Sequence, residues 1–252
     1  MPNPMRIPAG FTQQANFQPL RNFGTPDPVF YADMADDFMF YQAGRYTVTA
    51  TGNGTVAAAN LAGGVVTYTT NSSTPATTDI VSLQLNNAGT TFTAGMKTGF
   101  LCRVNLNADA TNPAFLAGLI QKTTTPFTVT DGAYILKPSG STTITAYVVV
   151  GSVVKASLAI PAATFAFATT TWVDLALVYE GKDDLLIYAG TGLIGGVPDQ
   201  NREPFGLVGR ISGVASGNML TAAVLTPTVA LQSGTATSKT AGLDFVRALA
   251  ER

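Results

Sequence analysis

Short segments in which apolar and polar residues alternate, or apolar residues run together, follow one another along most of the chain. Two pairs of these segments flank turn sequences: 142–150 and 153–160 are separated by Gly151-Ser152, and 172–179 and 185–188 by residues 180–184. Alternation with a period of two residues is typical of strands, and these two pairs predict β-hairpins. The other expected strands are 46–50, 65–69, 80–85, 100–106, 115–120, 133–136, 219–225 and 243–249.

The spacing of these segments predicts an all-β protein. A dozen or more short strands follow at intervals of about 8 to 14 residues, and no amphipathic helix of three turns separates them. Residues 241–252 fit a short helix and a terminal strand about equally. No repeat of fixed period occurs, which disfavours solenoids and propellers. We therefore predict an antiparallel β-sandwich of the jelly-roll type over residues 36–252.

The first 35 residues differ from the rest and are assigned to an extended N-terminal arm. Proline lacks the backbone donor that a central strand needs, and six of the 14 prolines lie in this segment. Many apolar side chains accompany them, so the arm is expected to dock on protein. It either wraps its own domain or reaches a neighbouring chain, and we favour the second. The candidate partner-binding residues are Ile7, Phe11, Phe17, Leu20, Phe23, Phe30 and Tyr31.

Composition narrows the classes of partner. Only 12% of residues are charged, against about a quarter in ordinary proteins, so the chain is expected to bury much of its surface against other proteins. No cluster of basic residues occurs, which argues against nucleic acid. No apolar run of about 18 residues predicts a membrane span, and the N-terminus lacks the apolar core of a signal peptide, so synthesis in a cytoplasm is expected. The single cysteine, Cys102, is predicted to be a buried apolar residue without a disulfide.

Residues that catalysis requires are scarce. The chain has no histidine and three glutamates, Glu180, Glu203 and Glu251, and none of them forms an acid pair on an expected sheet face. We therefore predict no catalytic residue, no cofactor and no metal. Asp183-Asp184 is read as part of a hairpin turn. A second acidic cluster, Asp33, Asp36 and Asp37, could hold calcium but is read as a solvated junction between arm and domain.

Two further features have a functional and a structural interpretation. Residues Gly190–Gly195 match the G-x-G-x-x-G pattern of dinucleotide sites, but the sequence that follows has no helical period, so a surface loop is expected. Trp172 could be an exposed platform for a sugar ring. A tryptophan that packs on the sheet is the default interpretation.

Several motifs occur in a fixed order between residues 36 and 252. They are Asp37-Phe38, Arg45–Thr49, Lys97–Phe100, Ala117–Leu119, Thr124–Gly132, Trp172–Tyr179 followed by Glu180–Lys182, Asp244–Val246, and Glu251-Arg252. This order resembles that of small head proteins of tailed phages, which have a concanavalin A-like (laminin G-like) jelly roll. The arm is the part that least resembles the family.

The resemblance implies a bacteriophage structural protein without enzymatic activity. It would be a decoration, or cement, protein that binds the major capsid protein on the outside of the head and stabilises the capsid. It would belong to the virion and assemble in the host cytoplasm as a homo-oligomer, with a trimer favoured over a dimer because shells have local threefold axes.

A carbohydrate-binding module on the tail fibre or head is the alternative. Its candidate contact residues are the aromatics Tyr134, Tyr147, Tyr179 and Tyr188. A glycan-cleaving enzyme is a third and much weaker possibility, because histidine is absent and glutamate is scarce.

Overall fold

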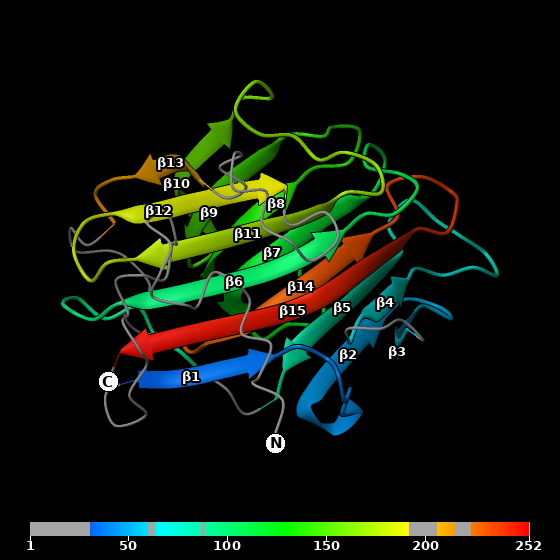
Figure 1. The fold of residues 1–252 in the computed structure, drawn as a ribbon, viewed down its shortest axis with the longest axis horizontal. Coiled ribbons are helices and arrows are strands. Elements are labelled where there is room, and N and C mark those ends of the chain that lie inside the picture. Colours follow the sequence, from blue (N-terminus) through cyan, green and yellow to red (C-terminus); the bar gives the residue numbers. More distant parts are fainter. Residues whose placement is uncertain (1–30, 60–63, 87–88, 192–205, 215–222, 252) are drawn as a thin grey trace, which may run out of the picture.

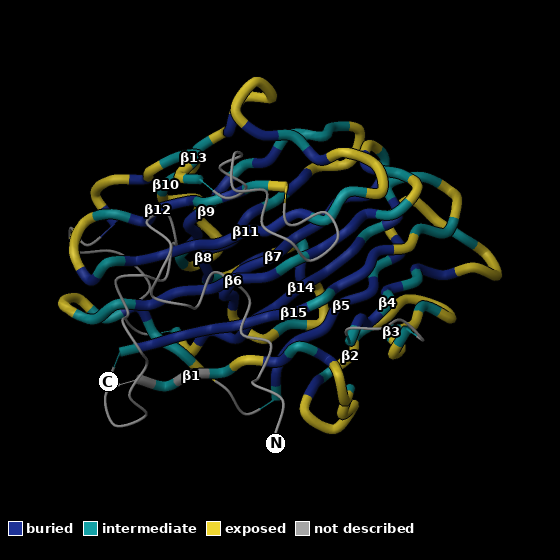
Figure 2. The backbone as a smooth tube through the Cα atoms, viewed as in Figure 1, coloured by how far each residue is buried: buried dark blue, intermediate teal, exposed yellow. Residues whose placement is uncertain are grey.

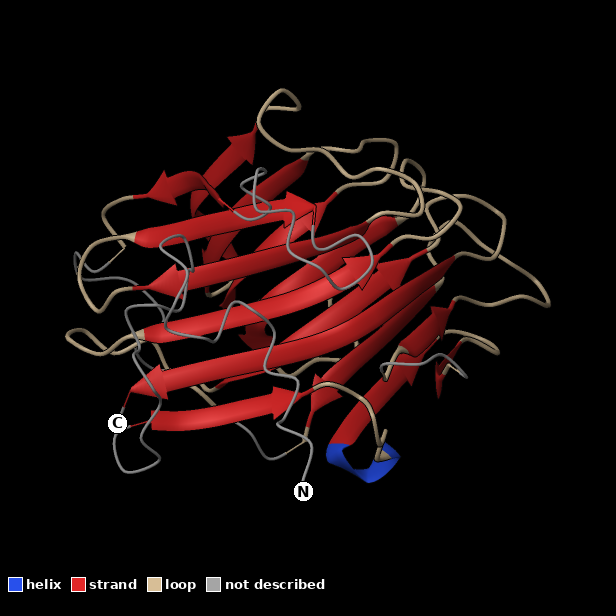
Figure 3. Cartoon of the chain, in the orientation of Figure 1, coloured by secondary structure: helices blue, strands red, loops and turns tan. Residues whose placement is uncertain are grey.

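The computed structural model describes residues 31–59, 64–86, 89–191, 206–214 and 223–251, and these form two antiparallel sheets packed face to face (Figure 1). The prediction of an all-β sandwich is confirmed. Among the described residues the single helical element is a 3₁₀ turn, η3 (Ala43–Arg45), drawn in blue in Figure 3. Accordingly, no helix in the described ranges has the length and apolar character needed to cross a membrane.

The front sheet has eight strands and the back sheet has seven. In spatial order the front sheet contains β13 (Gly206–Ile211), β12 (Leu185–Thr191), β11 (Trp172–Tyr179), β6 (Thr98–Asn105), β15 (Thr240–Glu251), β4 (Val66–Thr69) and β3 (Thr55–Ala58), with β1 (Tyr31–Asp36) also paired to β15. The back sheet contains β10 (Val153–Ile160), β9 (Ile144–Val150), β8 (Gly132–Lys137), β7 (Ala114–Gln121), β14 (Leu225–Gln232), β5 (Ile80–Leu85) and β2 (Tyr46–Ala50).

Strand β15 lies in the middle of the front sheet although it is the last strand in the sequence. One edge pairs with β6; the other pairs first with β4, at Thr240–Leu243, and then with β1, at Val246–Glu251. The register against β6 shifts at Asp244, which is the extra residue of a β-bulge. The C-terminal segment is therefore a strand, which decides between the two interpretations of residues 241–252.

The expected strands agree with the observed ones with one exception. The prediction of a strand over 219–225 is wrong for residues 223 and 224, which are not in a strand; its last residue, Leu225, begins β14. Four strands were not predicted: β1, β3, β13 and β14. Both predicted hairpins are present, as β9–β10 and β11–β12.

The sandwich begins earlier than the assigned boundary at residue 36. Residues 31–35 belong to β1, and Tyr31 is the Cα partner of Glu251. Assigning them to an extended arm was wrong. They form a short strand that pairs with β15, and the prolines just before this strand had argued against it. The other candidate residues of the arm, from Ile7 to Phe30, lie outside the described residues.

The hydrophobic core lies between the two sheets and carries most of the stability. Alternate residues of each strand point into it, among them Phe100, Phe115, Ile135 and Leu175, all at most 1% exposed. Burying a side chain of this size contributes about 1.5 to 3 kcal/mol. Cys102 is also fully buried and unpaired, as predicted, and burial raises the pKa of its thiol. Figure 2 shows the central strands as continuous buried segments.

The outward side of the front sheet is also apolar. Leu101, Val178, Leu186, Phe245 and Leu249 form a cluster there, none of them more than 6% exposed. When one face of an antiparallel sheet is turned toward water, the residues on that face are normally polar. We call these five residues the outer cluster.

Candidate functional site

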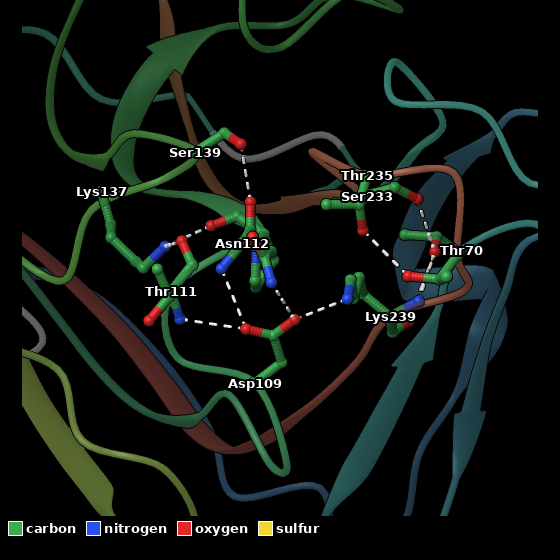
Figure 4. Close-up of polar contacts among 11 residues, drawn as sticks. Thr70, Asp109, Thr111, Asn112, Lys137, Ser139, Ser233, Thr235 and Lys239 are labelled. Carbon is green, nitrogen blue, oxygen red and sulfur yellow. Dashed lines mark hydrogen bonds and ion pairs between the residues drawn. The ribbon is translucent and has the colours of Figure 1, made fainter.

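Four loops meet at one end of the sandwich and form what we call the loop rim: residues 70–79, 106–113, 138–143 and 233–239 (Figure 4). Antiparallel pairing brings them together, because β7 begins where β14 and β8 end. The Cα partners there are Ala114 with Gln232 and Phe115 with Lys137. The front sheet adds its loops at the same end through the pairing of Thr69 with Thr240.

Asp109 organises the first of these loops. Its Oδ1 accepts hydrogen bonds from the backbone N–H groups of Thr111 (3.1 Å) and Asn112 (2.9 Å). Its Oδ2 accepts from Asn112 Nδ2 (2.9 Å) and forms an ion pair with Lys239 Nζ (2.5 Å). Burial alone would raise the pKa of Asp109, but the bonds from Asn112 and the Lys239 ammonium outweigh it and hold this pKa well below its usual range. The carboxylate is therefore ionised and saturated with donors.

Lys137 is the most unusual side chain of the rim. It ends strand β8, is 0% exposed, and directs its ammonium at three backbone carbonyl oxygens. These belong to Thr111 (2.8 Å), Pro138 (3.2 Å) and Pro113, so each of the three N–H donors has an acceptor available. Burial lowers the pKa of Lys137 to about 8. The lysine clamps the 106–113 loop to the 138–143 loop.

A third contact joins the rim to the front sheet. The hydroxyl of Thr70 accepts hydrogen bonds from Ser233 Oγ (2.9 Å) and from the backbone N–H of Lys239 (2.8 Å), and Thr70 N–H donates to Lys239 O (2.9 Å). Thr70 and Ser233 are both 0% exposed. The rim is therefore held by buried polar contacts, which fix a single arrangement of its loops.

Above these contacts the rim presents hydroxyl groups to solvent. Thr111, Ser139 and Thr237 are exposed, and Asn112 is partly exposed. Trp172 begins β11 at the same end, is partly exposed, and packs against Gly242, where a Cβ would come within 3.0 Å of the indole. This end of the sandwich therefore carries exposed hydroxyl-bearing residues and a partly exposed tryptophan. Asp109 cannot serve as a base here, because its acceptor positions are taken.

The four tyrosines named as candidate sugar contacts lie in different places. Tyr134 and Tyr147 stack on each other, with ring centroids 5.4 Å apart, on the outward side of the back sheet. Tyr179 is 3% exposed and packs in the core against Phe92. Tyr188 is partly buried beside the outer cluster. Strand alternation and sheet position separate these tyrosines, so they do not form one shared site.

The acidic cluster at the start of the domain is a buried corner. Asp36, 8% exposed, accepts hydrogen bonds from Phe38 N–H (2.9 Å), Tyr46 O–H (2.5 Å) and Arg45 Nη1 (3.1 Å). Interpreting this cluster as a solvated junction was wrong for Asp36, because these donors replace water. The described ranges contain no group of three or more acidic, cysteine or histidine side chains placed to hold a metal.

Two other motifs can be placed only in part. Asp183 and Asp184 lie in the β11–β12 turn, as predicted, and Asp184 pairs with Arg210 of β13 at 3.3 Å. Gly190 and Thr191 end β12, and the remainder of the G-x-G-x-x-G match lies outside the described residues.

Sequence reasoning did not single out the residues that build the rim. One usable signal was Lys137, a lone charge at the end of the apolar segment 132–136 and directly before a proline. Another was Asp109 three residues before Asn112, a spacing typical of side-chain-to-backbone turns. The pairing of Asp109 with Lys239 joins residues 130 positions apart and had no local signal.

Comparison with known proteins establishes the fold. No family model and no curated protein matches the chain. Among solved structures it is similar to arcelin-5, a lectin-like defense protein of Phaseolus vulgaris, at 8% identity and TM-score 0.57, covering 88% of this chain and 99% of arcelin-5. It is also similar to the CBM2 module of the evolved Dit of Lactobacillus casei BL23 phage J-1, at 14% identity and TM-score 0.55, covering 88% and 96%. The Emp47p carbohydrate recognition domain matches at 11% identity and TM-score 0.53, covering 88% and 97%.

These similarities identify a lectin-like, concanavalin A-like jelly roll. The same fold also includes an enzyme: an endo-1,3-beta-glucanase of Streptomyces sioyaensis matches at 10% identity and TM-score 0.53, covering 89% of this chain and 98% of the enzyme. The fold alone therefore does not distinguish a binding protein from a hydrolase, and the distinction must come from the residues of the site.

Proposed function

We propose that this chain is a non-catalytic binding module that recognises carbohydrate. The observation that carries the proposal is the loop rim, where buried polar contacts fix loops that bear exposed hydroxyl and amide residues, at the same end of the sandwich as Trp172. Sugars are bound by fixed polar groups together with an apolar ring face. The lectin-like fold supports this reading, because one similar structure is a carbohydrate recognition domain and another is a phage CBM2 module.

Three carboxylates, on the front sheet and on the loop rim, favour binding over hydrolysis because each is already engaged. Glycosidases need two carboxyl groups flanking the scissile bond, one of them able to donate a proton. Asp174 and Asp244 lie on one sheet face, but both bond to the guanidinium of Arg103. Asp109 is saturated by its own loop and by Lys239. None of these three is free to act as the acid.

A glycan array probed with the full chain tests the proposal, followed by titration of any hit while the fluorescence of the single tryptophan, Trp172, is recorded. The variant Thr111→Val/Thr237→Val removes two exposed rim hydroxyls and should weaken binding about tenfold or more, at about 1 kcal/mol per hydrogen bond. Thr124→Val, exposed on a loop at the opposite end, is the matched control. Absence of any glycan hit, or equal affinity of both variants, would contradict the proposal.

A second candidate is the head decoration protein of a tailed phage, bound to the major capsid protein on the virion exterior as a homotrimer. The specific observation favouring it is exposed apolar surface on a chain of low charge. Met39 and Phe40 are 56% and 83% exposed. They follow Phe38, whose backbone N–H donates a hydrogen bond to the buried Asp36. Apolar side chains on a rigid corner suit a permanent protein contact.

In this second candidate residues 1–30 contact a neighbouring chain through their apolar side chains. Replacing Phe17 with the photo-crosslinker p-benzoylphenylalanine in assembled particles should give products between two chains, either with the capsid protein or with a second copy. Products confined to one chain would refute the contact. Deleting residues 1–30, which leaves β1 intact, should abolish occupancy of the capsid, and full occupancy after this deletion would equally refute the contact.

A further inference from the structure

The ammonium of Lys137 lies where a bound cation would be expected. The carbonyl oxygens of residues 111, 113 and 138 all point at the Lys137 ammonium. Without water, such a group of acceptors needs either hydrogen-bond donors or a coordinated cation. The lysine itself is fully buried, and the hydrogen bond to Pro113 is buried as well. Removing the lysine would leave the carbonyl of Thr111 with the hydrogen bond from Gly140 N–H (3.0 Å), and would take the lysine donor from all three carbonyls.

Burial lowers the pKa of Lys137, so its ammonium depends on the three carbonyl oxygens and on the nearby Asp109 carboxylate. The titratable groups near Lys137 on the rim are Asp109, whose charge favours the ammonium, and Lys239, which pairs with that same carboxylate. Asp109 and Lys239 balance each other, so the carbonyl dipoles around Lys137 remain to be matched by one more cation. Lys137 supplies it from within the chain.

We propose that the loop rim contains a monovalent cation site that the chain fills with its own lysine, and that shortening this side chain opens the site to potassium or an alkylammonium ion. The ligands are carbonyls alone, a set that suits a large monovalent ion better than Mg²⁺, which prefers carboxylates and water. In the natural chain the rim therefore keeps its shape without any free metal. The inference does not depend on whether the rim binds carbohydrate.

The test is the thermal unfolding of Lys137→Ala in the full chain, measured in KCl, in ethylammonium chloride and in tetramethylammonium chloride at equal ionic strength. We expect the variant to unfold at a lower temperature than the natural chain. Potassium or ethylammonium should raise its midpoint by about 3 to 5 °C at ten times the dissociation constant, and the bulky tetramethylammonium should not. Equal midpoints in all three salts would overturn the proposal.

Two matched variants separate a cation site from a general effect of salt. Lys239→Ala also removes an ammonium from the rim, but this ammonium bonds to a carboxylate. The unfolding midpoint of this variant should therefore be the same in all three salts. Lys137→Met fills the space with an apolar chain and should be destabilised without rescue. If Lys137→Ala does not fold in tetramethylammonium, its refolding yield from urea in each salt gives the same answer: recovery only with potassium or ethylammonium supports the site, and recovery in none overturns it.

Discussion

The guanidinium of Arg103 on β6 meets the carboxylate of Asp174 on β11 through two parallel hydrogen bonds, Nε to Oδ1 at 2.8 Å and Nη2 to Oδ2 at 3.1 Å. The two residues are Cα partners in the ladder, so both side chains leave the same face directly opposite each other. The same guanidinium reaches Asp244 at the bulge of β15, at 3.4 Å, and lies 5.5 Å from the ring centre of Phe245. One cation thus links three neighbouring strands within an apolar face.

Replacing Arg103 with methionine should cost about 2 to 4 kcal/mol of unfolding free energy near neutral pH, because the Asp174 carboxylate is left without its counter-charge. Burial raises the pKa of Asp174 even in the natural chain, and losing the guanidinium raises it further. A carboxyl whose pKa is higher folded than unfolded destabilises the fold above that pKa and ceases to do so once protonated. The deficit should therefore narrow as the pH falls toward about 4.

Urea unfolding of the Arg103→Met variant at the two pH values checks this, with Lys182→Met in the exposed β11–β12 turn as the control. The control should change stability by less than about 0.5 kcal/mol. A deficit for Arg103→Met that is the same at both pH values would show that Asp174 does not gain a proton.

Gly234 should be far less tolerant of alanine than Gly140, although both have left-handed backbone angles, φ of 68° and 76°. A Cβ at Gly234 would lie 2.0 Å from the carbonyl oxygen of Asn112, whereas nothing lies within 4 Å of one at Gly140. Gly140→Ala should cost about 1 to 2 kcal/mol, the ordinary left-handed penalty. Gly234→Ala should cost clearly more, as measured by chemical unfolding; equal losses would mean that the rim loops can move apart.

Lys137 should make stability depend on alkaline pH. Its pKa falls from 10.5 to about 8 on folding, so folding disfavours the ammonium. Between about pH 8 and pH 10.5 the unfolded chain holds a proton that the folded chain releases, and the unfolding free energy rises with pH. Measured relative to Lys137→Met, which cannot titrate there, the natural chain should gain stability across this window. A constant difference would show that the three carbonyls keep the lysine charged.

Phe38 and Phe40 should respond in opposite ways to substitution. Phe38 is 2% exposed in the core, and its replacement by alanine should cost about 3 to 5 kcal/mol. Phe40 is 83% exposed, so Phe40→Ser should leave the melting temperature unchanged. If the corner attaches the chain to a capsid, the same variant should lose occupancy on particles while remaining folded. Full occupancy would assign attachment to another surface.

The strands that were predictable are those whose local signals agree with the fold. Gly151 and Ser152 both adopt positive φ, 58° and 63°, which is the geometry of a tight hairpin turn, and the flanking segments alternate. Strand β14 was missed because Pro227 occupies its interior. Leu225 exchanges backbone hydrogen bonds with Thr90. Backbone groups two residues apart in a strand point to the same side, so the nitrogen of Pro227 also points to the side of Thr90. The ladder with β5 begins there only at Thr228, so the missing donor costs nothing.

The rim was not predictable for a different reason. Its contacts join loops distant in sequence, as when Lys137 reaches the carbonyl of Thr111 and Thr70 meets Ser233. Each residue alone reads as an ordinary polar position of a loop. Only the order of strands within the two sheets, which no local pattern encodes, makes them neighbours.

The central place of β15 has a consequence for the time course of folding. Strand β6 lies on one side of β15, and β4 and β1 lie on the other. Only β15 joins these two sides by strand pairing. During synthesis at about 5 to 20 residues per second, β1 waits some tens of seconds for its partner to leave the ribosome. For that interval the edges of β6, β4 and β1 that later pair with β15 are open and can pair with other chains. Slower elongation should then lower the yield of soluble protein, and a chaperone that covers strand edges should restore it.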